Sequence, residues 1–104
     1  MKKVLFSVVL GVFMTGAAMA EVTDLQLATS KNCMSCHAVE RKVLGPSFKD
    51  VAAKYRDNKG AVDLLAGKIM KGGSGVWGPV PMPANTQVSD ADAKKLAAWV
   101  LSAK

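Results

Sequence analysis

Apolar residues recur at helical spacing along most of the chain, and no strand-like run follows the first twenty residues. Residues 47–57 and 61–71 each carry a complete stripe at i, i+3, i+4 and i+7: Phe48, Val51, Ala52 and Tyr55 in the first, and Val62, Leu65, Ala66 and Ile69 in the second. A weaker periodicity over residues 22–31 predicts a short helix, with Thr23 or Asp24 as its cap. These patterns predict an all-α domain.

The last helix has the clearest signals. Its start, Ser89-Asp90-Ala91-Asp92, resembles a capping box, and its buried stripe is predicted to comprise Ala93, Leu96, Ala97, Val100 and Leu101. Trp99 lies beside this stripe, and we expect it to pack against another helix. The domain is therefore expected to contain about four short helices.

A long irregular segment, residues 72–88, separates the last two predicted helices. It holds four of the nine glycines and three of the four prolines, together with Trp77. Loops of this length inside small domains are usually functional or disordered. The stiff stretch Pro79-Val80-Pro81-Met82-Pro83 argues for a defined wall rather than for disorder.

The first twenty residues follow another pattern. Lys2 and Lys3 precede an apolar run, and Ala18-Met19-Ala20 stands before Glu21. This arrangement predicts a cleavable signal peptide over residues 1–20 and one exported domain over residues 21–104. The apolar run is too short to span a membrane well, so a membrane-embedded protein is not expected.

The charge balance favours a protein partner. The chain has a formal net charge of +6, and removal of the two signal-peptide lysines leaves 12 basic and eight acidic residues. A modest positive charge suits docking onto an acidic protein surface. No dense basic run interleaved with aromatic residues is present, so no nucleic-acid partner is expected.

The stretch Cys33-Met34-Ser35-Cys36-His37 carries the most specific chemistry. On a helical turn, residues i, i+3 and i+4 share a face, so both thiols can join the vinyl groups of one haem while His37 reaches the iron. A thioredoxin-like pair would need a βαβ context, and zinc would need four ligands. A disulfide here would close a very small loop and stabilise little.

A haem held by His37 needs a sixth ligand or an open site. The chain has no second histidine and six methionines. Three of these belong to the predicted signal peptide, Met34 lies inside the attachment turn, and Met70 lies near a helix end. Only Met82 lies on an irregular loop, between Pro81 and Pro83, although methionine also fills core gaps often.

The Gly45-Pro46 turn has two interpretations. An iron-ligating histidine usually donates its other ring N–H to a carbonyl or carboxylate, and the rigid turn offers a carbonyl. Alternatively, Pro46 only starts the next helix. The domain of 84 residues is also small for a self-sufficient core, so we expect the chain without haem to be largely unfolded.

These motifs together resemble the small bacterial class I cytochromes c of the c-551 type. The resemblance covers residues 21–104 and is carried by the attachment stretch, the Gly45-Pro46 turn, Val76-Trp77-Gly78-Pro79-Val80-Pro81-Met82-Pro83-Ala84-Asn85 and Leu96-Ala97-Ala98-Trp99-Val100-Leu101.

The resemblance implies an all-α fold around one haem c, attached through Cys33 and Cys36, with iron held by His37 and Met82. It further implies that Pro46 accepts a hydrogen bond from His37, that Trp77 donates to a haem propionate, and that Asn85 donates near the Met82 sulfur.

Three positions depart from the family pattern. Asn32 stands where glycine is common, and asparagine tolerates the left-handed backbone. Ala84 replaces a second proline after Met82, which makes the loop less rigid. Lys68 occupies a position where arginine often lies near a propionate, and lysine lacks the bidentate geometry of arginine.

The expected function is electron transport in the periplasm by a soluble monomer that is not an enzyme. The resemblance implies a donor such as a membrane quinol-oxidising complex, and an acceptor such as nitrite reductase, a peroxidase or a terminal oxidase. Two alternatives remain from the residues: a haem enzyme or small-ligand sensor whose methionine dissociates, and a thiol-disulfide protein.

Overall fold

The computed structural model describes residue 11 and residues 23–104. Apart from Gly11, the predicted signal peptide therefore lies outside the described residues, as do its cleavage site and Val22. Three of the methionines lie there too. The described elements are α1 (Asp24–Ser30), a 3₁₀ turn η1 (Cys33–Ser35), α2 (Phe48–Tyr55), α3 (Ala61–Lys71) and α4 (Asp90–Leu101). Over this part of the chain the only β pairings are two isolated bridges, and the all-α prediction is confirmed.

The helix ends follow from local chemistry. Ser47 and Ser89 each accept a hydrogen bond from the backbone N–H three residues on, at 3.1 Å, which satisfies a free donor of the first turn of α2 and α4. Gly60 and Gly72 have φ angles of 81° and 71°, and they bound α3 on both sides. Asn32 takes the predicted left-handed conformation, with φ 67°.

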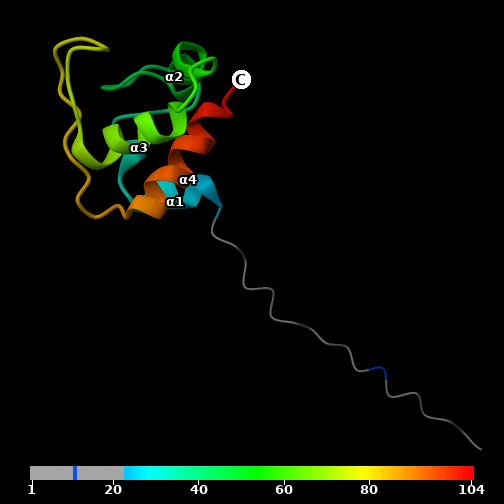
Figure 1. Ribbon diagram of the computed structural model, residues 1–104. Helices are drawn as coiled ribbons and strands as arrows, with labels where there is room; N and C mark the ends of the chain where they lie inside the picture. Colours follow the sequence, from blue (N-terminus) through cyan, green and yellow to red (C-terminus); the bar gives the residue numbers. More distant parts are fainter. Residues whose placement is uncertain (1–10, 12–22) are drawn as a thin grey trace, which may run out of the picture.

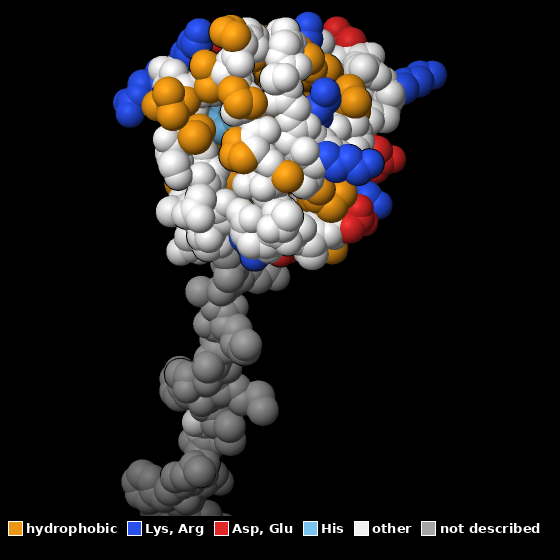
Figure 2. Space-filling view, turned by 90° about the vertical axis from the view of Figure 1, so that its left-hand side faces the viewer, with side chains coloured by type: hydrophobic (Ala, Val, Ile, Leu, Met, Phe, Trp, Pro, Cys, Tyr) orange, Lys and Arg blue, Asp and Glu red, His pale blue; other side chains and the backbone are white. Residues whose placement is uncertain are grey.

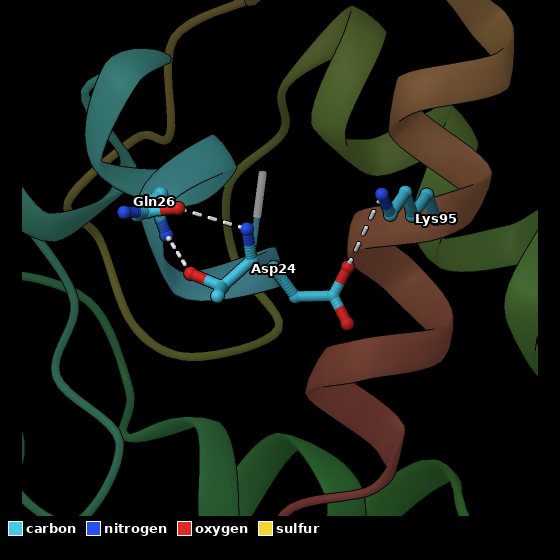
Figure 3. Close-up of polar contacts among 4 residues, drawn as sticks. Asp24, Gln26 and Lys95 are labelled. Atoms are coloured by element: carbon cyan, nitrogen blue, oxygen red, sulfur yellow. Dashed lines mark hydrogen bonds and ion pairs between the residues drawn. The ribbon is translucent and has the colours of Figure 1, made fainter. Parts of the chain in front are cut away.

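The first helix is fastened at its N-terminus. Thr23 and Gln26 exchange hydrogen bonds in a capping box, so the predicted cap at Thr23 is confirmed. Figure 3 shows Asp24 pointing from α1 toward Lys95 of α4, where the ion pair measures 3.9 Å. Because the two charged groups lie 3.9 Å apart and Lys95 is about half exposed, this pair contributes little, and the burial of Ala28 in the core holds α1 in place.

The core lies where α4 crosses the other helices (Figure 1). α4 packs most extensively on α3 and also contacts α1 and α2. Small buried residues, Ala66, Ala93 and Ala97, let the helix backbones approach one another closely around Leu96. Trp99 packs edge-on against Phe48 of α2 with ring centroids 5.3 Å apart, so the predicted helix packing of Trp99 is confirmed.

The 72–88 loop runs along one side of the helices, in yellow to orange in Figure 1. The backbones of Gly73 and Met82 exchange two hydrogen bonds, of 3.0 and 2.8 Å, which close the middle of the loop. The Gly75 N–H donates to the Gly78 carbonyl at 3.0 Å inside it. The irregular segment is thus a defined wall, as its prolines predict. No helix among the described residues is both long enough and apolar enough to cross a membrane.

Candidate haem-binding site

A largely apolar cavity of about 220 Å³ lies between the helices and the 72–88 loop. Residues of all four helices, of the segment between η1 and α2 and of the 72–88 loop line it. Figure 2 looks onto the loop side, where hydrophobic side chains surround a hollow in which the pale-blue side chain of the chain's single histidine is visible. Seven of the eight predicted site residues line this cavity, namely Cys33, Cys36, His37, Pro46, Lys68, Trp77 and Met82.

The attachment turn is set by its own backbone. The N–H groups of Cys36 and His37 both donate to the Cys33 carbonyl, at 3.2 and 3.1 Å, which tightens the turn and brings the two thiols to the same cavity. Both cysteines are free thiols. Burial raises the pKa of the Cys33 thiol, against a smaller lowering by its own backbone hydrogen bond. A thioredoxin-like pair would also need a βαβ unit, and the described elements are all helices, so this site does not fit a thioredoxin-like protein.

The imidazole of His37 is held on three sides. Its Nδ1 lies 2.8 Å from the carbonyl oxygen of Pro46, and donation to that carbonyl leaves Nε2 with a free lone pair for a metal. The ring stacks on Phe48, with centroids 5.1 Å apart. A Cβ at Gly45 would overlap the ring at Cε1, so glycine is required there. Because α2 begins at Phe48 with Ser47 as its cap, Pro46 is not the first residue of the helix.

Met82 is placed by backbone contacts. Besides its bridge to Gly73, its carbonyl lies so close to Gly72 that a Cβ at position 72 would overlap it. Met82 is half-buried and lines the cavity. The other two described methionines, Met34 and Met70, instead pack against the hydrophobic core and do not line the cavity.

Two lysines lie at the margin of the site. Lys68 lines the cavity, and Lys54 Nζ lies 5.8 Å from the ring centroids of both Tyr55 and Trp77. The sequence pattern gave no signal for Lys54, because it lies outside the apolar stripe of α2 and its contact with Trp77 joins segments distant in sequence. The two positive charges suit a ligand that carries carboxylates.

Asn85 lies outside the cavity lining. Its side-chain amide donates to the Ile69 carbonyl at 2.8 Å and to the Pro83 carbonyl at 3.5 Å. The hydrogen bond that the resemblance implies near the Met82 sulfur therefore remains a prediction.

The residues present fit a haem. The cavity offers an apolar lining for a flat ring, two thiols for attachment, an imidazole with a fixed tautomer and a thioether. For carboxylates there are Lys68 in the lining and Lys54 beside Trp77. The described residues hold no group of three or more His, Cys, Asp or Glu side chains placed to bind a metal ion by themselves.

Comparisons with known proteins agree with this fit. Residues 25–104 match the family model described as cytochrome c. The chain is 54% identical to cytochrome c-552 of Hydrogenobacter thermophilus over 104 residues, which cover all of both chains. It is 54% identical to cytochrome c-551 of Azotobacter vinelandii over 79% of this chain and 99% of that protein.

A solved structure gives the same result. The crystal structure of wild-type Nitrosomonas europaea cytochrome c552 matches with a TM-score of 0.76 and 59% identity, over 77% of this chain and 99% of that one. The chain therefore belongs to the cytochrome c family, as a small class I electron-transfer cytochrome with one covalently bound haem c.

Proposed function

We propose that this cytochrome is a periplasmic electron carrier, not an enzyme, in which His37 Nε2 and the Met82 sulfur hold the iron from its two sides. The observation that carries the proposal is that His37, with its tautomer fixed by Pro46, and Met82 line one cavity. Ligation of haem iron by histidine and methionine would raise its reduction potential. The bound haem supplies one-electron exchange between its ferric and ferrous states.

The chain's own residues then have three tasks. Cys33 and Cys36 tether the ring, while Phe48 and Gly45 fix the imidazole plane. The apolar lining excludes water from the iron. Iron held by both side chains would have no open position for a substrate, so the bound group would supply electron transfer alone.

The partners that we propose are periplasmic redox proteins: a membrane quinol-oxidising complex as donor, and nitrite reductase, a peroxidase or a terminal oxidase as acceptor. Support comes from the excess of lysine and arginine over acidic residues, which favours encounter with acidic protein surfaces. The roles of Trp77 and Lys68 toward the propionates belong to the same proposal. Both residues line the cavity, and Lys54 adds a further positive charge beside Trp77.

The ligation is tested by replacing Met82 with alanine. We expect Met82→Ala to lose the charge-transfer band of Met-ligated ferric haem and to bind carbon monoxide rapidly in the ferrous form. Met70→Leu, which changes a methionine packed against the core, is the matched control and is expected to keep the wild-type spectrum. Retention of the Met-ligated spectrum by Met82→Ala would remove Met82 from the iron.

A further inference from the structure

Gln87 and Lys31 exchange two hydrogen bonds, although 56 positions separate them in the chain. The Gln87 side-chain amide donates to the Lys31 carbonyl at 3.1 Å, and Lys31 Nζ donates to the Gln87 carbonyl at 3.1 Å. We call this reciprocal pair the Lys31–Gln87 clasp. Lys31 follows the last residue of α1 and stands two positions before Cys33, so the clasp holds the 72–88 loop against the start of the attachment turn.

The same side-chain amide of Gln87 also makes a hydrogen bond to a residue close to Met82 in the sequence. Its Nε2 also donates to Asn85 Oδ1 at 3.2 Å. Asn85 in turn donates through its own amide to the carbonyls of Ile69, at 2.8 Å, and of Pro83, at 3.5 Å. Because Pro83 is bonded directly to Met82, these hydrogen bonds link Lys31, two positions before Cys33, to the residue beside Met82.

The segments before and after Met82 are therefore held in place by different contacts. Toward Gly73 the backbone bridge holds it directly. In the other direction Pro83, Ala84, Thr86 and Gln87 are all exposed, and Val88 is the next fully buried residue. Exposed segments with few buried contacts open most readily. Hydrogen bonds from the side chains of Asn85 and Gln87 hold residues 83–88 in place. Two backbone hydrogen bonds, from Asn85 to Ile69 and from Val88 to Asn85, add to them.

We propose that Gln87 is a positioning residue for Met82, which keeps the loop closed on the attachment turn and so slows the departure of the thioether from the iron. This inference rests on the proposed ligation by Met82. Gln87 lies on the surface and does not line the cavity, so it acts through Asn85 and Lys31 and not by contact with the haem.

The test uses the haem-loaded protein with Gln87→Met, which keeps the side-chain length and charge but removes the amide. Cyanide binds ferric iron only after the thioether has left, so its binding rate at saturating cyanide reports how often the loop opens. Loss of two neutral hydrogen bonds is expected to raise this rate roughly tenfold. Thr86→Ala changes the exposed neighbour, whose side chain makes no hydrogen bond among the described residues, and should leave the rate unchanged.

A second measurement separates loop opening from general loosening. In Gln87→Met, amide hydrogen exchange should quicken at Met82 and Asn85 but not at Leu96 in the buried core of α4. Lys31→Met, which removes the Lys31 Nζ bond of the clasp but keeps both bonds of the Gln87 amide, should give a cyanide rate between those of the wild type and Gln87→Met. A wild-type cyanide rate in Gln87→Met, or exchange that quickens equally at Leu96, would overturn the positioning role. If Met82→Ala has meanwhile lost its Met-ligated spectrum, the proposed ligation still stands.

Discussion

Gly45 lies flat against the imidazole of His37, and a side chain at position 45 would come within 2.8 Å of Nδ1 and overlap Cε1. The glycine is needed for this close approach, because the ring is already fixed by Pro46 on one side and by Phe48 on another. The backbone of the Gly45-Pro46 turn thus sets the plane of the imidazole.

Gly45→Ala is therefore expected to rotate or displace His37. The overpacking should lower the free energy of unfolding of the haem-loaded protein by about 1–3 kcal/mol and shift its reduction potential. Guanidinium unfolding and a redox titration measure these effects. Gly67→Ala, in the middle of α3 with open space around its Cβ position, is the control and should stabilise by about 0.5–1 kcal/mol. Equal behaviour of the two variants would contradict the role of Gly45.

Phe48 joins the attachment turn to α4, because its ring contacts both His37 and Trp99. Its side chain is 6% exposed, so Phe48→Ala should cost about 3–5 kcal/mol in the free energy of unfolding. Leu64→Ala removes another large apolar side chain, but from an exposed position of α3, and should change stability by less than about 0.5 kcal/mol. Denaturant unfolding of both variants measures the two changes in stability. Equal shifts of the two unfolding midpoints would contradict the role of Phe48.

Removal of the haem is expected to unfold the chain. The cavity crosses the interior, and its lining includes Leu65, Leu96 and Val100, which are core residues as well. A Cys33→Ala/Cys36→Ala double variant, purified free of haem, should therefore have little helical circular dichroism under native conditions. A cooperative thermal transition with wild-type helix content in this variant would show that the protein core suffices alone.

Positive charge near the iron favours the ferrous state, because the ferric ion carries one more positive charge. Lys68→Met and Lys54→Met should both lower the reduction potential, by roughly tens of millivolts, and less at high salt. Lys94→Met is the matched control, since Lys94 lies on α4 in an exposed pair with Asp90. A potential unchanged in all three variants would show that neither lysine acts on the haem.

The local parts of this fold could be predicted from the sequence. The stripes of α2, α3 and α4 repeat every turn, and Thr23, Ser89, Asn32 and Gly72 have backbone preferences that act over a few residues. The attachment stretch is likewise local, because its three reactive groups lie within five positions. Met82 was predicted by exclusion, from the proline-rich sequence around it.

The parts that were not predicted depend on pairs far apart in the chain. Nothing near Gln87 indicates that its amide will meet the Lys31 carbonyl, and nothing near Lys54 indicates Trp77. Trp99 was predicted to pack against a helix, which it does, but it also lines the cavity. In so small a domain one face of a side chain meets the core while the other meets the ligand.

The backbone bridge between Gly73 and Met82 limits how far substitutions inside the loop can move Met82. It isolates residues 74–81 as a closed loop whose ends are fixed independently of the side chains inside it. Val76 and Val80 project from this loop and are about half exposed or more, at 48% and 60%. Both also line the cavity, so substitutions there are expected to change the surface at the mouth of the site while the bridge holds the backbone of Met82. The rim of the cavity and the position of the Met82 backbone can thus be altered separately, within one short segment of chain.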